Sequence, residues 1–390
     1  MPEKKHLDIR RGCLIYRLGA LLLAGLWWGG GFGLPVLHAG APAPIPVGTR
    51  HLGEHQIASV GTVTLQSGAV VDDVKVSYVT HGALNPKRDN VVLVMHRFIG
   101  DHHDYDFLIG PGKALDTNKY FVVATDFLGN SRLRQDLTTG PTNSGLGIDF
   151  PTYSISDSVT VEHQLLADYL GFEHILAAIG TSMGGMKAYQ LAVRYPTFMR
   201  GIVSIVGTPA VNPRAKFVLR RMMETIALDP AWYAGRYQTN PTVGLTAALM
   251  NLVPWWFVYD WYADNLRDPA AFRQFEQKWH DVFTSQLPQD ARDVYYQLQA
   301  WSTFDLGDTP GFNGDTQAAL QAIQVPTLLI GGAGDPLVHR QEIRAASTHI
   351  PRATHVEIDS PYGHACCIGV DPEATQVMAQ AIRDFLDRLQ

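Results

Sequence analysis

The sequence predicts an α/β protein whose mostly parallel, doubly wound sheet is interrupted by a helical insertion. The strongest signal is a set of short, continuous apolar runs, which suit parallel strands buried on both faces. These runs cover 91–95, 120–125, 175–179, 202–206, 327–330 and 355–358. Helical patterns lie between several of them, notably at 158–170 and 186–195. Strands that alternate with helices in this way indicate a parallel doubly wound sheet.

The first 39 residues predict an export signal. Basic residues precede an apolar stretch at 18–37, among them Lys4, Lys5, Arg10 and Arg11, and a small-residue cleavage site follows at 37–39. This order is the plan of a secretory signal. An uncleaved membrane anchor is the rival interpretation, because the stretch is about as long as a bilayer span. We expect a periplasmic or secreted protein that starts near residue 40.

Charge and cysteine usage limit the classes of function. The 390 residues carry a formal net charge of −6 without a basic block, which argues against nucleic acid as the main partner. The three cysteines imply no disulfide framework. A bridge between the adjacent Cys366 and Cys367 would be strained, so we expect both to pack as small hydrophobic residues.

The pattern divides the mature chain into a core and an insertion. After a linker at 41–50, alternating runs at 55–65 and 70–78 predict two antiparallel strands. The alternation of strands and helices that follows is broken between 211 and 317. We therefore expect a core formed by 40–210 and 318–390, with a helical lid at 211–317.

The predicted lid combines helical periodicity with many aromatic residues. The periodic segments are 215–228, 245–252, 270–283 and 290–301, and the aromatic residues include Trp232, Tyr233, Trp255, Trp256, Phe257, Tyr259, Trp261 and Tyr262. One interpretation is a helical subdomain that buries these side chains internally. The other is a lid whose inner face lines an apolar acyl pocket.

A candidate nucleophile lies in the pentapeptide Gly180-Thr181-Ser182-Met183-Gly184. It follows the apolar run at 174–179 and precedes the helical pattern at 186–195. A G-x-S-x-G at a strand-to-helix turn is the nucleophile elbow of the α/β-hydrolase fold, where a sharp turn exposes the serine hydroxyl. A glycine-rich turn that happens to hold a serine is the alternative. The context favours the elbow, and with it Ser182 as nucleophile.

Asp335 and His364 occupy the positions expected of an orienting acid and a general base. A serine hydroxyl needs a base within hydrogen-bond reach, and in this fold an acid and then a histidine follow the serine along the chain. Asp335 ends a glycine-rich loop after the strand at 327–330, and His364 lies between the strand at 355–358 and the last helix. A turn aspartate and an ordinary loop histidine are the alternatives. We expect His364 to take the proton of Ser182 while Asp335 orients the imidazole.

Two backbone amides are expected to bind the oxyanion. One belongs to Met183, directly after the nucleophile, and the other to Phe98, in the loop after the strand at 91–95. The neighbouring His102, His103 and Asp104 raise the question of a metal site. We expect none, because adjacent histidines point apart in an extended strand and no carboxylate-rich partner motif is evident.

With these residues in place, the chain resembles the homoserine O-acetyltransferase family of α/β-hydrolases from about residue 55 to its end. The matching segments are 90–94 leading into 100–101, 110–117, 128–130, 147–151, 180–186 and 360–364. The resemblance implies that Ser182, Asp335 and His364 are the triad, in agreement with the argument from the residues. It also implies an acyl-serine formed from acetyl-CoA and transfer of the acyl group to the homoserine hydroxyl.

The chain departs from the family pattern on the acceptor side. The family usually carries an arginine six residues before an Asp-Pro in the first lid helix, where it holds the carboxylate of the amino acid. Counting back from Asp229-Pro230 gives Met223, with Arg220 and Arg221 nearby. The family's Gly-His-Asp reads Gly363-His364-Ala365, and its His-Ala-Leu-Thr-Gly loop reads His-Arg-Phe-Ile-Gly at 96–100.

These departures and the expected export lead to a hydrolase as the first hypothesis, because an exported enzyme would meet little acetyl-CoA or homoserine. It would cleave a small or apolar acyl ester through an acyl-serine. An O-acyltransferase that uses acyl-CoA and a hydroxyl acceptor is one alternative, and a catalytically silent binding protein is the other. We expect a small-molecule acyl substrate, no cofactor, no nucleic acid and no membrane for the mature form; a homodimer is left open.

The export hypothesis predicts a shortened mature chain. When the full-length protein is produced in a Gram-negative host, we expect it in the periplasmic or culture fraction, with an N-terminus near residue 40. Cell fractionation and N-terminal sequencing measure both properties. An intact N-terminus in the cytoplasmic fraction would contradict export, and an intact N-terminus in the membrane fraction would favour the anchor.

Overall fold

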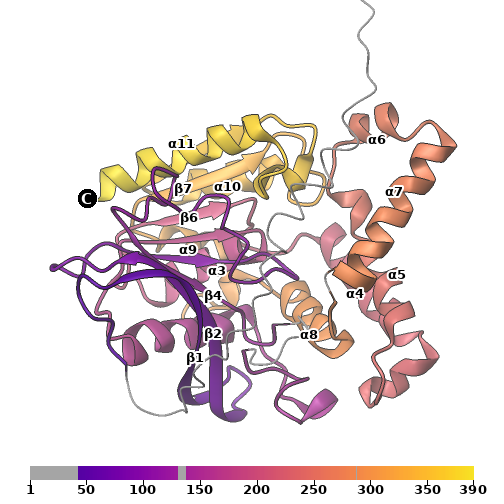
Figure 1. Cartoon of the computed structure of the whole chain (residues 1–390), viewed down its shortest axis with the longest axis horizontal. Coiled ribbons are helices and arrows are strands. Elements are labelled where there is room, and N and C mark those ends of the chain that lie inside the picture. Colours follow the sequence, from indigo (N-terminus) through magenta and orange to yellow (C-terminus); the bar gives the residue numbers. More distant parts are fainter. Residues whose placement is uncertain (1–42, 131–137, 287) are drawn as a thin grey trace, which may run out of the picture. The chain divides into compact units, whose positions relative to one another are not determined.

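The computed structural model describes residues 43–130, 138–286 and 288–390, so the expected export signal at 1–39 lies outside the described residues. The described chain is built on an eight-stranded sheet (Figure 1). Its strands are β1 (Arg50–Thr64), β2 (Val70–Ala83), β3 (Val91–Met95), β4 (Phe121–Thr125), β5 (Ala177–Thr181), β6 (Ile202–Ile205), β7 (Thr327–Gly332) and β8 (Ala353–Ile358). Strands β3 to β8 are parallel, and β2 and β1 extend one edge in antiparallel pairs. The predicted mostly parallel sheet is confirmed.

The continuous apolar runs of the sequence form the central strands. Every residue of β3, β4, β5, β6 and β7 is buried, as expected for strands covered on both faces. The edge strand β1 is different, because only two of its fifteen residues are buried. The core therefore lies along the middle of the sheet, and β1 is its solvent-facing margin.

The order of the strands creates a crevice between β3 and β5. The strands follow one another as β1-β2-β4-β3-β5-β6-β7-β8. The chain therefore leaves β3 towards β4 on one side and leaves β5 towards β6 on the other. Such a topological switch opens a crevice beyond the carboxyl ends of the two strands. The register pairs Met95 with Gly180, so the loops that follow β3 and β5 begin next to each other.

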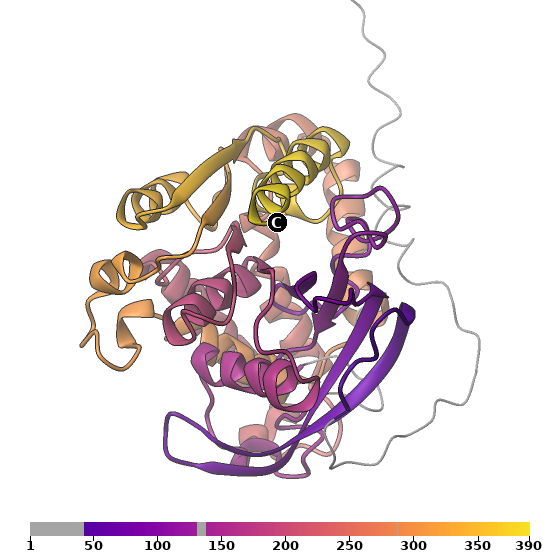
Figure 2. The same cartoon turned by 90° about the vertical axis from the view of Figure 1, so that its left-hand side faces the viewer.

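Helices cover the sheet on both faces. One layer consists of α2 (Ile155–Gln164), α3 (Met183–Arg194), α9 (Thr316–Gln321) and α10 (Arg340–His349), which contact one another in that order. On the opposite face, α11 (Pro372–Leu389) packs with apolar residues of 105–115 in one buried cluster. Figure 2 shows the sheet between these two layers, with α11 in yellow.

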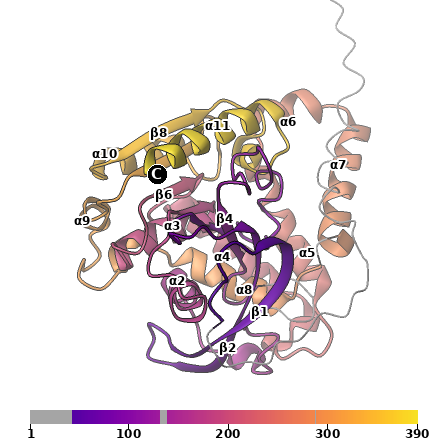
Figure 3. The ribbon, with the colours of Figure 1, turned by 60° about the vertical axis from the view of Figure 1, so that its left-hand side comes forward.

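A helical insertion separates β6 from β7. It contains α4 (Pro213–Ala227), α5 (Thr242–Met250), α6 (Tyr259–Asn265), α7 (Pro269–Asp281) and α8 (Ala291–Ser302), and Figures 1 and 3 show these helices together at one side of the core. Asparagine or aspartate side chains cap α4, α7 and α8 at their N-termini, which explains where these helices begin. Among the described helices, none is by itself long and apolar enough to cross a membrane; only the bent pair Thr242–Trp255 and Tyr259–Asn265 passes that test in combination.

Several boundaries differ from those expected. Helix α3 begins at Met183, directly after the candidate nucleophile, rather than at residue 186. Gly184 and Gly185 have low helix propensity, so the sequence pattern placed the start of the helix after them. The hairpin strands are also longer than predicted, because β1 begins at Arg50 and β2 continues to Ala83.

A buried ion pair joins α2 to α3. Lys187 donates to Glu162 over 2.5 Å, and the Thr125 hydroxyl donates to the same carboxylate oxygen over 2.7 Å. The ammonium also lies 3.6 Å from the centre of the Phe127 ring. Burial lowers the pKa of Lys187 to about 8, although Glu162 acts in the opposite direction. The pair therefore compensates two charges that would otherwise be costly inside the core.

This geometry predicts an asymmetric response to substitution. Lys187→Met leaves the Glu162 carboxylate buried without its cation, and we expect it to lower the free energy of unfolding by about 3–5 kcal/mol. Adding Glu162→Gln removes that charge while it keeps an acceptor for Thr125, and should restore much of the loss. Urea unfolding followed by circular dichroism measures both variants. A single variant within about 1 kcal/mol of the parent would contradict the assignment.

Candidate active site

Ser182 lies at the tip of a sharp turn between β5 and α3. Its backbone has φ 55° and ψ −113°, a strained conformation for a residue with a side chain. A Cβ on Gly180 would lie 1.9 Å from the carbonyl oxygen of Gly184, so only a glycine at position 180 allows a turn this tight. The serine side chain makes no capping bond to α3, so its hydroxyl remains available to a base. The predicted elbow geometry is present.

The structure places the three predicted side chains in one hydrogen-bonded chain. His364 Nε2 lies 3.0 Å from Ser182 Oγ, and His364 Nδ1 lies 2.7 Å from Asp335 Oδ2. All three residues are buried, with 3% of Ser182, 7% of His364 and 2% of Asp335 exposed. This order of nucleophile, imidazole and carboxylate is the arrangement in which a base takes the serine proton and the carboxylate holds the imidazole tautomer.

The Asp335 carboxylate is fixed by its own loop. Its Oδ1 atom accepts the backbone N–H groups of Leu337 and Val338 at 2.8 and 2.9 Å, which leaves Oδ2 for His364. Asp335 therefore acts both as the turn aspartate and as the acid that orients the imidazole. The two amides set the direction of the carboxylate before it meets the imidazole.

The loop that carries His364 is held by the insertion. Gly363 has a φ of 50°, and a Cβ there would lie 2.9 Å from the carbonyl oxygen of Trp256. The same carbonyl accepts the N–H of Ala365 at 3.1 Å, and the N–H of Val258 donates to Pro361 at 3.3 Å. A larger residue at 363 would separate these backbones, so the glycine before the base allows the insertion to fix its loop.

The two predicted oxyanion donors come from neighbouring loops. Met183 is the first residue of α3, so its N–H has no acceptor within the helix. Phe98 lies in the loop after β3, which we call the oxyanion loop (residues 96–104). A Cβ on Gly184 would lie 2.1 Å from the carbonyl oxygen of Met95. The start of α3 and the start of the oxyanion loop are therefore in close contact.

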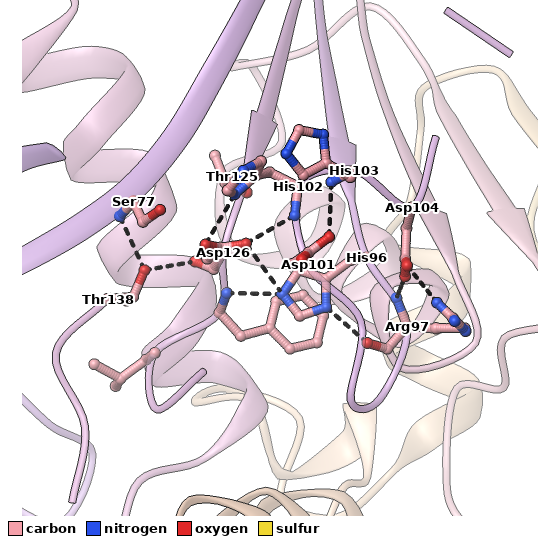
Figure 4. A network of polar contacts seen from close by, with 12 residues as sticks. Ser77, His96, Arg97, Asp101, His102, His103, Asp104, Thr125, Asp126 and Thr138 are labelled. Carbon is pink, nitrogen blue, oxygen red and sulfur yellow. Dashed lines mark hydrogen bonds and ion pairs between the residues drawn. The ribbon is translucent and has the colours of Figure 1, made fainter. Parts of the chain in front are cut away.

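A buried polar network holds the oxyanion loop (Figure 4). Asp126 accepts the His102 backbone N–H at 2.8 Å and contacts His102 Nδ1 at 3.0 Å. Burial alone would favour the neutral carboxyl, but the charge and hydrogen bond of His102 hold the pKa of Asp126 below its usual value. Burial lowers the pKa of His96, which lies in the same network. These contacts tie the loop to the end of β4.

The geometry expected for His102 and His103 is wrong, because residues 102–108 form turns and not an extended strand. The two rings do not point apart; their centres are 4.3 Å apart. Each contacts a different carboxylate, His102 that of Asp126 and His103 that of Asp106. Within the described residues, no group of three histidine, cysteine or acidic side chains is arranged to hold a metal ion.

The insertion contacts each of the three loops that carry candidate site residues. Trp301 of α8 packs against Phe98, with ring centres 5.3 Å apart. Arg214 of α4 donates to the carbonyl oxygen of Pro336 in the acid loop, and Trp256 binds the base loop as described above. These individual contacts could not be predicted, because groups that meet across 100 or more residues leave no local pattern.

The aromatic residues of the insertion pack mainly on one another. Trp256 meets Trp279 with ring centres 4.7 Å apart, and Phe257 stacks on Trp261 at 4.4 Å. Phe257 also meets Tyr362 in the base loop at 6.0 Å. The internal-packing interpretation therefore accounts for much of this cluster, and one edge of it reaches the candidate site.

The position of the family's carboxylate-binding arginine is filled by a partly buried Met223 on α4. The two nearby arginines are exposed. Arg221 pairs with Glu224 and lies over the Phe217 ring. The departure noted in the sequence is therefore not offset by Arg220 or Arg221.

Known proteins with a similar sequence or structure share the fold. Residues 90–368 match a family described as the alpha/beta hydrolase fold. The chain is 30% identical over 390 residues to a homoserine O-acetyltransferase of Symbiobacterium thermophilum, covering 89% of this chain and 98% of that protein. A homoserine O-acetyltransferase structure from Bacillus anthracis has a TM-score of 0.79 at 26% identity (86% and 98% covered). The structure of esterase E22 has a TM-score of 0.76 at 27% identity (86% and 100% covered).

The hydrogen-bonded chain predicts how the site reacts. We expect a fluorophosphonate probe to label the protein once, and Ser182→Ala to abolish the labelling. Asp335→Asn should lower kcat for an activated ester by roughly 10⁴-fold, because the amide favours the wrong imidazole tautomer. Intact-mass spectrometry and ester assays measure these effects. Labelling that persists in the Ser182→Ala variant would show that another residue is the nucleophile.

Proposed function

This chain belongs to the homoserine O-acetyltransferase-like family of α/β-hydrolase enzymes, and we propose that it is an O-acyltransferase that moves a small acyl group to a hydroxyl acceptor. The acyl group comes from an acyl thioester such as acyl-CoA and passes through an ester with Ser182. The observation that carries this proposal is the hydrogen-bonded chain from Ser182 through His364 to Asp335 in a buried site. The similarity to homoserine O-acetyltransferases supports transfer as the outcome.

The first half of the reaction acylates the serine. Ser182 Oγ attacks the acyl carbonyl while His364 Nε2 takes its proton, and the carbonyl oxygen becomes an oxyanion facing the amides of Phe98 and Met183. When the tetrahedral intermediate collapses, the bond to the thiol breaks and the thiolate takes the proton from His364. The acyl-serine and a free thiol remain.

The second half transfers the acyl group. His364 removes the proton of the acceptor hydroxyl, whose oxygen attacks the acyl-serine carbonyl and forms a second oxyanion in the same place. Collapse breaks the bond to Ser182 Oγ, which recovers its proton from His364. Asp335 stabilises the imidazolium in both halves. The product is an ester of the acceptor, and the enzyme returns to its starting state.

Burial of the site supports an organic acceptor over water. Only 3% of Ser182 and 7% of His364 are exposed, and the insertion contacts the oxyanion loop, the acid loop and the base loop. A site that limits the entry of water protects a reactive acyl-enzyme from hydrolysis. Transfer then depends on an acceptor that binds long enough for His364 to activate it.

Hydrolysis of a small acyl ester is the second candidate, and Met223 is the observation that favours it. Without an arginine at that position, the site lacks the group that the family uses to hold an amino acid carboxylate. Ala365 after the base departs from the family pattern as well. The similarity to esterase E22 supports this candidate, as does the export expected from residues 1–39.

The partition of the acyl group distinguishes the two candidates. With p-nitrophenyl acetate as donor, we expect homoserine or a simple alcohol to divert most acetyl groups from acetate to the acceptor ester, and acetyl-CoA to serve as donor. Product analysis by mass spectrometry measures the ratio, with Ser182→Ala as the blank. Equal amounts of p-nitrophenol and acetate at every acceptor concentration would identify a hydrolase.

A further inference from the structure

The direction of the Phe98 N–H is set by contacts to the carbonyl of the same peptide group. The carbonyl oxygen of Arg97 is 2.7 Å from His96 Nδ1 and accepts the N–H of Gly100 at 3.0 Å. The described chain contains no cis peptide bonds, so the C=O and N–H of this peptide point in opposite directions. Whatever fixes the Arg97 carbonyl also aims the Phe98 N–H.

His96 is held in a single tautomer for this contact. Its Nε2 atom accepts the backbone N–H of Phe127 at 3.0 Å, so Nδ1 carries the proton that is donated to Arg97. The ring is 1% exposed and stacks on Phe127 with ring centres 3.8 Å apart. Rotation of the imidazole would break both hydrogen bonds inside the core, where unpaired polar groups are costly.

Asp104 holds the same segment from the other side. Its Oδ2 atom accepts the backbone N–H of Arg97 at 3.1 Å, and its Oδ1 atom pairs with the Arg97 guanidinium. A Cβ on Gly100 would lie 2.0 Å from Asp104 Oδ2, so the carboxylate covers the backbone of the turn closely. Figure 4 shows His96 and Asp104 on either side of this segment.

The turn that these side chains hold is strained. Ile99 has a φ of 53°, a left-handed conformation that is an outlier for a β-branched residue. It follows Phe98 in the turn closed by the hydrogen bond from Gly100 to Arg97. Such a conformation persists only when the surrounding contacts determine it. Without them, the turn would relax and the Phe98 N–H would change direction.

We propose that His96 and Asp104 are positioning residues that fix the Arg97–Phe98 peptide as an oxyanion donor. The hydrogen bond from His96 also polarises that peptide, which makes its N–H a stronger donor. Neither side chain touches the substrate; each acts through the backbone of the oxyanion loop. This inference rests on the proposed function, because it needs an oxyanion to form on Ser182.

The test compares turnover with the binding of an oxyanion mimic. We expect His96→Leu and Asp104→Ala each to lower kcat for p-nitrophenyl acetate by about 10–100-fold, less than the roughly 10²–10³-fold cost of removing an oxyanion donor, while KM changes less than about twofold. The mimic is an alkyl trifluoromethyl ketone: Ser182 Oγ adds to its carbonyl carbon, and the carbonyl oxygen becomes an oxyanion. Its inhibition constant should rise by the same factor as kcat falls.

Conservative variants distinguish a loss of the positioning hydrogen bonds from a defect in folding. An asparagine amide N–H can replace the Nδ1 donor, so His96→Asn should recover most of the kcat that His96→Leu loses. Asp104→Asn keeps an acceptor for the Arg97 N–H but loses the charge, and should lower kcat by about 10-fold with an equal loss of ketone affinity. These two variants carry the test if the leucine and alanine variants do not fold.

The neighbouring His103 and Asp106 provide a matched control. They form the same kind of pair over 3.0 Å, but both are substantially exposed. Asp106→Ala, which breaks this pair at its residue outside the oxyanion loop, should leave kcat and ketone inhibition within about twofold of the parent. Active sites are counted by fluorophosphonate titration, so that kcat refers to intact sites only.

Two outcomes distinguish the proposals. If the parent enzyme reacts with the probe, but the His96 and Asp104 variants keep its kcat and ketone affinity after correction for active sites, the positioning role is wrong. If the parent reacts neither with the fluorophosphonate nor with the ketone, the proposed acyl-serine chemistry itself is wrong.

Discussion

The close packing of α3 against the end of β3 is the constraint on which the candidate site depends. A side chain on Gly184 would collide with the carbonyl oxygen of Met95, and one on Gly180 would collide with Gly184. The glycines therefore let the first turn of α3 approach β3. That approach brings Ser182, the orphan N–H of Met183 and the oxyanion loop together at the crevice between β3 and β5. The parallel sheet supplies the crevice, and the glycines allow the nucleophile and the oxyanion donors to lie close together in it.

The insertion completes what the sheet begins. The nucleophile, acid and base follow different strands, and their loops would be free to move independently. Contacts from Arg214, Trp256 and Trp301 reach the acid loop, the base loop and the oxyanion loop. The same segment therefore fixes the relative positions of these loops. These contacts are a physical reason why the protein devotes so many aromatic residues to a region outside the sheet.

Much of this arrangement was predictable because its signals are local. Apolar runs mark buried strands, and the residue types that follow them mark an elbow, an acid and a base in an order that fits the fold. The polar contacts of the oxyanion loop were not predictable in the same way. His102 and His103 were expected in an extended segment, but turns bring their rings together. His96 gave no signal either, because its role depends on a hydrogen bond to Phe127, which lies 31 residues away in the chain.

The sequence by itself determined the fold class, the family and the candidate triad, since periodicity and motif spacing are written along the chain. The tertiary structure decided how the site is held. Only there do the amides of Leu337 and Val338 fix Asp335, and only there does the carbonyl of Trp256 hold the base loop. The first is a local contact of an aspartate side chain, whereas the Trp256 carbonyl meets a loop far along the chain, and such a backbone contact has no residue-type signature. The tertiary structure also shows that Arg221, beside Met223, is exposed and does not form a carboxylate clamp.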